Sequence, residues 1–266
     1  MQNRDESDHP LNQKGRVRAP APPKRKPARL VDRPLLTYTL VALNGLIFLA
    51  GYLVPELEWE LFLRGALLPE LVVFNGEVYR LFTAMFLHGS LAHVLFNSYA
   101  IFIVGQTVEP IFGRARFLLI YFLGGLTGSA ASLALGGLGG ASVGASGAVF
   151  AIFAAQGVHL YQHRGVYVNA RAQLRHMAIL IGINLLIGFL PGSRIDNWGH
   201  IGGMLGGAVL AWRIGPRLVR PSAPVRSVRD LAKLDRNPLR LHLPELVIYI
   251  GALIGLVVLV INLLAA

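Results

Sequence analysis

Cysteine is absent from the 266 residues of the chain. The protein can therefore form no disulfide, and it offers neither a thiol nucleophile nor a thiolate metal ligand. Charged residues are also scarce, at 15% of the chain against 54% hydrophobic residues, and the mean hydropathy is +0.54. Soluble domains carry about 25% charged residues, so this composition excludes a single soluble domain and indicates a protein that crosses the membrane several times.

Acidic residues are the rarer kind of charge: 14 Asp and Glu stand against 25 Lys and Arg, and the formal net charge is +11. The basic residues gather before residue 34 and between residues 213 and 240. Such clusters beside apolar runs are typical of loops kept on the cytoplasmic side of a bilayer. We therefore expect the lipid bilayer, and no nucleic acid, as a partner of the basic segments.

The N-terminal segment lacks the features of a signal peptide, because the first apolar run begins only near Leu35. Residues 1–33 alternate charge with proline and cannot bury enough apolar surface to order themselves. We predict that they form a disordered basic tail in the cytoplasm.

Seven apolar runs follow this tail, and we interpret them as the membrane-spanning helices of an all-α polytopic protein. They lie at about 35–54, 91–108, 117–135, 146–163, 177–190, 198–214 and 246–264. The resulting division is a six-span core at 34–214, a basic cytoplasmic linker at 215–243 and a seventh transmembrane helix at 244–266.

The arginines predict how the chain is oriented. With the N-terminus in the cytoplasm, the connections that contain Arg114, Arg164 and Arg213 all fall inside, whereas the glutamate-rich segment 55–80 falls outside. We therefore expect an integral protein of the plasma (inner) membrane of a bacterium. Segment 55–80 is too charged to span the membrane and too apolar to be a fully solvated loop, so we expect it to lie at the outer interface.

Two polar residues near the starts of predicted apolar helices are candidate catalytic residues. Ser146 lies among small residues, in Gly144-Ala145-Ser146-Gly147-Ala148, which leaves a substrate backbone room to approach, and His200 lies near the start of the sixth run. A serine hydroxyl is a weak nucleophile unless a base within ~3 Å takes its proton. Because the fourth and sixth spans run in the same direction, both residues lie near the outer side. We predict a Ser146–His200 dyad whose active site opens to that side.

Acyl transfer also needs donors for the oxyanion that it creates. His93 and Asn97 are four residues apart on the second span, hence on one face, and the Ser146 N–H at a helix start adds a third donor. His88 should be rotated away from that face. No acid completes a triad, because Asp196 lies in a loop four residues before His200.

A dyad requires the fourth and sixth helices to pack closely. Gly203 and Gly207 form a small-xxx-small row below His200. The small residues that can face this row are Gly147, Ala151 and Ala154. Gly202, one position round the helix, should tolerate a larger side chain better than Gly203.

Four patterns occur together in the chain. They are His88-x4-His93-x3-Asn97, Gly105-x3-Glu109-x3-Gly113, Gly-x-Ser-Gly at 144–147 and His200-x2-Gly203-x3-Gly207. Across about residues 35–214 the chain resembles the rhomboid family of intramembrane serine proteases. The resemblance implies a six-helix core, cleavage of transmembrane protein substrates with no cofactor or metal, Ser146 as nucleophile, His200 as base, and His93 and Asn97 at the oxyanion site. It also implies that the C-terminal helix makes this a six-plus-one form.

Two positions depart from the patterns common in that family. Tyr79-Arg80 stands where Trp-Arg often occurs in the first outer loop, and Phe150 stands where a tyrosine often stacks under the catalytic histidine. Phenylalanine keeps the ring face and loses the hydroxyl. We place Gly144 and Phe150 with His93 and Asn97 in the oxyanion and substrate-binding site.

Other polar residues have structural interpretations. Glu109 should bind backbone amides or Arg114 and Arg116, and Asn44 should donate a hydrogen bond between helices. His159 and His163 have a metal-like i, i+4 spacing but lie at the inner boundary, where an interfacial belt is the expected role.

Three other functions compete with the protease. A small transporter or channel could use the intramembrane histidines, but it needs polar groups across the whole membrane, whereas these gather at one depth. A catalytically inactive rhomboid-like protein that binds membrane clients would be expected to have lost Ser146 or His200. A metalloprotease using His88, His93 and His200 lacks the His-Glu-x-x-His pattern.

Overall fold

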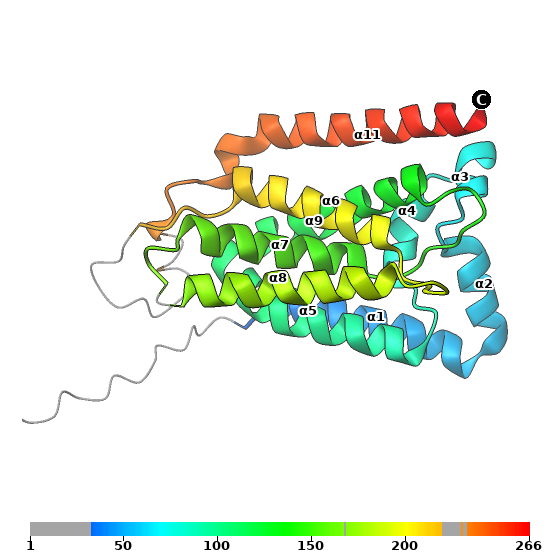
Figure 1. The fold of residues 1–266 in the computed structure, drawn as a ribbon, viewed down its shortest axis with the longest axis horizontal. Coiled ribbons are helices and arrows are strands. Elements are labelled where there is room, and N and C mark those ends of the chain that lie inside the picture. The colour runs from blue at the N-terminus through cyan, green and yellow to red at the C-terminus, as the bar shows by residue number, and fades with distance from the viewer. Residues whose placement is uncertain (1–32, 168, 220–229, 231–232) are drawn as a thin grey trace, which may run out of the picture.

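The chain folds into a bundle of long helices (Figure 1), seen in a computed structural model that describes residues 33–167, 169–219, 230 and 233–266. The long helices are α1 (Leu35–Leu53), α5 (Leu91–Phe112), α6 (Arg114–Leu135), α7 (Ser146–Gln162), α8 (Ala170–Gly188), α9 (Asn197–Ile214) and α11 (Leu243–Ala265). The short ones are α2 (Pro55–Gly65), α3 (Pro69–Asn75), α4 (Arg80–Thr83), η3 (Ala84–Phe86) and η4 (Leu239–His242). The predicted all-α fold is confirmed. The predicted tail, apart from Arg33, and part of the predicted linker lie outside the described residues.

Each predicted span coincides with one long helix, although some boundaries differ. α5 continues past residue 108 to Phe112 and contains Pro110 in its last turn. α8 begins at Ala170, well before the predicted start near 177, because its first turns carry Arg171 and Arg175 and a helix can extend beyond the apolar layer.

Four of the described helices are long and apolar enough to cross a membrane: α1, α5, α6 and the helix Leu239–Ala265 that η4 and α11 form together. Helices α7, α8 and α9 lie in the same bundle (Figure 1). The chain is thus an integral membrane protein, whereas the count of six spans plus one stays a prediction.

The centre of the bundle is formed by α6, α7 and α9, which are the helices in most extensive mutual contact. Helices α1 and α5 lie together on one side, and α11 lies along the opposite side (Figure 1). We call the end of the bundle near α2 and α3 the α2 end. The opposite end, where α9 ends and α11 begins, is the linker end (Figure 1).

Glu109 joins α5 to α1 at the linker end. Its buried carboxylate accepts hydrogen bonds from the backbone N–H groups of Leu36 (3.1 Å) and Thr37 (2.7 Å) and from the Thr37 hydroxyl (2.8 Å). The first N–H groups of a helix have no partner within that helix, so a carboxylate there satisfies them and complements the helix dipole. Arg114 lies 4.0 Å away, whereas Arg116 does not bind Glu109 as we had considered.

Segment 55–80 folds at the α2 end around the buried Arg80. The Arg80 guanidinium donates to the carbonyl oxygens of Leu63 (2.7 Å) and Ala66 (2.9 Å) and to the Glu77 carboxylate (2.7 Å). The Tyr79 hydroxyl donates to the same carboxylate at 2.9 Å. Through these hydrogen bonds, Tyr79 and Arg80 hold the short helices together.

Helix α11 docks against α6, α9 and α3. The Tyr249 hydroxyl lies 2.6 Å from the Thr127 hydroxyl on α6, and Glu245 accepts from Arg213 of α9 at 2.7 and 2.8 Å. Val260 is buried in an apolar cluster that includes Val72 of α3. Helix α11 is therefore held at several points along its length.

Candidate active site

A cavity of about 710 Å³ lies at the α2 end of the bundle, and Ser146, His200, His93 and Asn97 all line it. These side chains come from α7, α9 and α5, which are far apart in the sequence. The structure thus brings together the four residues that the sequence predicts to carry the chemistry. Phe150 also lines this cavity, and Gly144 lies directly against it.

Ser146 is the first residue of α7, and the loop before it is fixed by backbone hydrogen bonds. Ser142 exchanges two backbone bonds with Leu67, each 3.0 Å long, and the Gly144 N–H donates to Ala84 O at 2.9 Å. Gly144 has φ +128°, which side chains of L-residues rarely permit. The loop therefore delivers Ser146 to the cavity at the start of a helix, where its backbone N–H has no partner within α7.

His200 lies in the first turn of α9, which Asp196 caps. The Asp196 carboxylate accepts from the Gly199 N–H at 2.7 Å and from the Ser142 hydroxyl at 2.6 Å. The Phe150 ring stacks on the His200 imidazole, with centroids 4.3 Å apart and planes 19° from parallel. Asp196 is therefore engaged by the helix start and the Ser142 loop, in keeping with a dyad instead of a triad.

No hydrogen bond joins Ser146 to His200 within the described part of the chain, and the buried Nδ1 of His200 has no partner there. Catalytic hydrogen bonds are often long in a free enzyme and shorten when substrate binds. The shared cavity, and not a formed hydrogen bond, is what relates the two residues here.

Asn97 and His93 lie one turn apart on α5, beside the Gly144 loop. The Asn97 side chain is buried, and its Nδ2 has no partner among the described residues. A Cβ at Gly144 would lie 2.6 Å from His93 Nε2 and 3.5 Å from Asn97 Nδ2. A glycine is thus required here both for its φ and for the close approach of the loop to these two donors.

His88 lies where we did not expect it. Its ring packs edge-on against His93, with centroids 5.1 Å apart, and is not turned away from it. The expectation failed because α5 begins only at Leu91, so the rotation per residue of a helix does not apply to His88. Burial, with a smaller contribution from His93, lowers the pKa of His88 from 6.5 to about 4, so its ring is neutral at pH 7.

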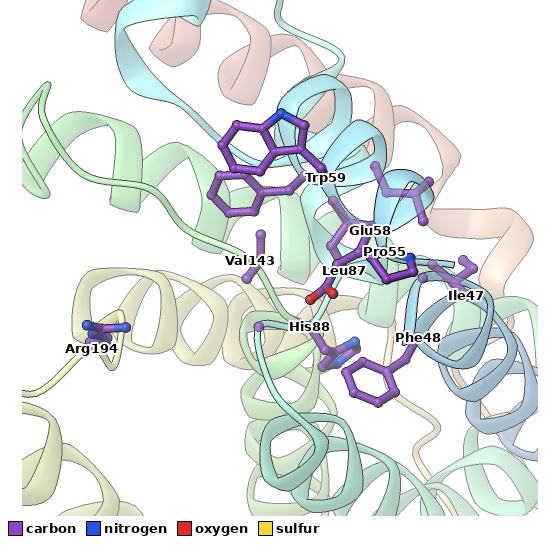
Figure 2. A pocket seen from close by; sticks show the side chains of 13 residues that line it. Ile47, Phe48, Pro55, Glu58, Trp59, Leu87, His88, Val143 and Arg194 are labelled. Atoms are coloured by element: carbon purple, nitrogen blue, oxygen red, sulfur yellow. The ribbon is translucent and has the colours of Figure 1, made fainter. Parts of the chain in front are cut away.

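A second cavity, of about 440 Å³, adjoins the first and shares Phe62, Gly89, Val143 and Arg194 with it. Glu58, His88 and Arg194 are among the residues that line this cavity (Figure 2). The walls come largely from α1 and α2, so segment 55–80 borders the candidate active site.

Close contacts between glycines set the spacing of α6, α7 and α9. A Cβ at Gly203 would overlap the Gly147 carbonyl oxygen, and one at Gly207 would overlap that of Ala151. The predicted small-residue row therefore faces α7 as expected. Gly128 of α6 completes the contact, because a Cβ there would lie 2.6 Å from the Gly199 carbonyl oxygen.

Gly202 is packed more tightly than the sequence indicates, and the milder effect of a substitution there stays a prediction. A Cβ at this position would overlap the Ala131 side chain and lie 2.8 Å from the Thr127 carbonyl oxygen, so Gly202 also makes a close contact, with α6. The sequence signal for this second contact is the Gly124-x3-Gly128 row on α6.

His159 and His163 lie at the linker end, away from the cavity. His163 Nδ1 lies 2.8 Å from the His159 carbonyl oxygen, and His163 Nε2 accepts from the Leu218 N–H at 3.0 Å. His159 Nε2 lies 3.0 Å from the Tyr167 hydroxyl. This pair therefore ties α7 to the segment after α9. Nowhere in the described ranges do three or more His, Asp or Glu residues form a group that could hold a metal ion.

The geometry can be compared with known proteins. A family model, the Rhomboid domain, matches residues 75–217, which is more than half of the chain. The chain belongs to the rhomboid family. This match contains Ser146, His200, His93 and Asn97, whereas α1 and α11 lie outside it.

Curated rhomboid relatives agree with this assignment. The chain is 36% identical to Rhomboid protease GluP of Bacillus subtilis (strain 168) over 187 residues, or 69% of this chain and 35% of that protein. It is 36% identical to RHOMBOID-like protein 1 of Arabidopsis thaliana over 151 residues, or 57% of this chain and 37% of that protein. It is 35% identical to RHOMBOID-like protein 2 of Arabidopsis thaliana over 187 residues, or 70% of this chain and 56% of that protein. The chain spans between 35% and 56% of the length of these three relatives. The first of these relatives is named as a rhomboid protease.

Proposed function

We propose that this rhomboid is an endopeptidase that cleaves a transmembrane segment of another membrane protein, with Ser146 as nucleophile and His200 as general base. The observation that carries the proposal is the single cavity shared by Ser146, His200, Asn97 and His93. The gathering of polar groups at one end of the bundle favours a reaction site over a transport route across the membrane.

The reaction proceeds in two stages. His200 accepts the Ser146 proton as the hydroxyl oxygen attacks the scissile carbonyl carbon, and it returns that proton to the leaving amine when the peptide bond breaks. A water molecule, deprotonated in turn by His200, then hydrolyses the acyl ester and frees Ser146. The Phe150 ring against one imidazole face fixes the orientation of the base during both proton transfers.

The oxyanion formed in each stage needs donors that are already in position. Asn97 Nδ2 is buried without a partner and therefore loses no existing bond when it donates to the oxyanion. The Ser146 N–H and the His93 ring supply the other donors. Gly144 keeps the loop close to these groups.

The site opens, in this proposal, to the outer side of the membrane, with the N-terminal tail and the linker in the cytoplasm. The linker end carries Arg213, Arg217 and Arg236, whereas α2 at the other end carries Glu56, Glu58 and Glu60. The positive-inside rule favours this orientation. The six-span core at 34–214 and the seventh helix at 244–266 complete the proposed organisation.

The first test is labelling with a fluorophosphonate probe in detergent or liposomes. We expect the parent and a Ser132→Ala control to be labelled and Ser146→Ala to remain unlabelled, because the probe reacts with an activated serine and Ser132 does not line this cavity. Labelling that survives Ser146→Ala would remove Ser146 as the nucleophile. A parent that does not react would favour an inactive, client-binding rhomboid.

Asn97→Ala, and to a similar degree His93→Ala, should slow turnover by about 10²-fold or somewhat less, with substrate binding little changed. The neighbouring donor and the Ser146 N–H cover part of the loss. Steady-state cleavage of a transmembrane substrate in liposomes measures the effect, with Asn262→Ala on α11 as a distant control. Parental turnover in both variants would assign the oxyanion to other groups.

A further inference from the structure

Asn184 of α8 lines the same cavity as Ser146 and His200, although the sequence analysis gave it no role. It lies in the apolar stretch 177–190, and its amide is exposed and makes no hydrogen bond within the described residues. An unpaired polar side chain in a membrane helix is costly and commonly serves a function. Its amide is therefore a binding group without an assigned ligand.

The contacts of α8 determine which way Asn184 faces. Near the α2 end, α8 is joined to α9 through Asn197, which donates to Leu185 O at 3.0 Å. A Cβ at Gly188 would overlap the Asn197 amide, so this face of α8 lies against the start of α9. Asn184 is four residues before Gly188 and shares its face, one turn deeper in the bundle. The amide therefore lies near the start of α9, which carries His200.

Asn262, Asn197 and Asn97 already have a partner or a place in the chemistry, whereas the buried Asn44 of α1 has no partner among the described residues and does not line the cavity. Asn262 of α11 donates to its own helix at Val258 O (2.9 Å), and Asn197 joins α8 to α9. Asn97 belongs to the proposed oxyanion site. Asn184 faces the cavity with both its donor and its acceptor available.

We propose that Asn184 binds the backbone of the substrate segment that has lost its helical structure at the site, an inference that rests on the proposed function. A helix hides its N–H and C=O groups in its own hydrogen bonds, so a transmembrane peptide bond must leave the helix before Ser146 can reach it. The released groups have lost their partners in the helix and need new ones, which protein groups in the cavity can supply. A carboxamide offers an N–H donor and a carbonyl acceptor together, which matches a peptide unit.

This role differs from that of the oxyanion donors. The contact forms when the unwound segment binds and persists through the reaction, so its loss should raise KM and leave kcat nearly unchanged. It is made to backbone and not to a side chain, so it should apply equally to substrates of unrelated sequence. A small probe that carries no helix should not need it.

The experiment compares the parent with Asn184→Leu, Asn184→Gln and the control Asn262→Leu in liposomes. Two transmembrane substrates of unrelated sequence are cleaved, KM is expressed as mole fraction in the lipid, and fluorophosphonate labelling of Ser146 is followed in parallel. We expect Asn184→Leu to raise KM about 10-fold for both substrates, with kcat and the labelling rate unchanged. Asn184→Gln should lie closer to the parent, and Asn262→Leu should match it.

Three results would overturn the inference: an unchanged KM in Asn184→Leu, a loss confined to one substrate, or slower labelling, which would indicate a displaced Ser146 instead of a lost contact. Failure of the proposed function has a different signature, because the parent itself would then cleave neither substrate. The comparison therefore separates the two failures.

Discussion

Replacing Ser146 with alanine is expected to abolish cleavage of a transmembrane substrate, and His200→Ala should do the same. The hydroxyl is unreactive without the base and the base has nothing to activate without the hydroxyl, so each loss should lower the rate by on the order of 10⁴-fold or more. For the same reason, the double variant should be no slower than either single one. The measurement is cleavage in liposomes with equal amounts of folded protein.

His176→Ala is a matched control for the histidine. His176 is exposed on α8 toward the linker end and does not line the cavity, so its loss should leave turnover at the parental level. Turnover above about 1% of the parental rate in Ser146→Ala would contradict its role as nucleophile, since losing a nucleophile costs far more than that.

Gly203→Val is expected to lower turnover by about 10²-fold or more although Ser146 and His200 are both intact. The new side chain must displace the Gly147 backbone, whose carbonyl carbon would lie 2.7 Å and whose Cα would lie 2.9 Å from the added Cβ. Backbone cannot move aside as a flexible side chain can, so α9 must shift from α7. A misplacement of ~1 Å at a catalytic group is enough for a loss of this size.

Gly255→Val on α11 provides the control, because no atom lies within 4 Å of a Cβ at that position. Gly202→Val should also lose activity and stability, since it displaces α9 from α6. Turnover and thermal unfolding should be measured for all three variants. Normal turnover in Gly203→Val would show that the contact between α7 and α9 does not set the geometry of the site.

The sequence was most informative for features that follow from the type and position of the residues alone. Polar residues at one depth predicted that Ser146, His200, His93 and Asn97 gather in one place, and a row of glycines predicted a close helix contact. It was less informative where the effect of a residue depends on which other helix packs against it. Gly202 and Gly203 look alike in a helix, and only the fold shows that a different helix fills the space beside each.

His88 and Asn184 illustrate two further limits. The orientation of His88 depends on where α5 begins, which a spacing rule cannot supply. Asn184 is a single amide in an apolar stretch, with no motif around it. Its relevance appears only when α8 is seen to place it beside residues that follow it and precede it in the chain.

The docking of α11 has a consequence for how the protein is made. A ribosome completes α9 before α11, so the surface that receives α11 faces lipid for a time. Thr127, the polar group of that surface, donates its hydroxyl to Leu123 O at 2.8 Å within its own helix. Arg213, which later binds Glu245, lies in the last turn of α9 at the linker end. During biosynthesis neither group is therefore an unsatisfied polar group in the hydrocarbon core of the membrane. The incomplete bundle can tolerate the delay until α11 inserts.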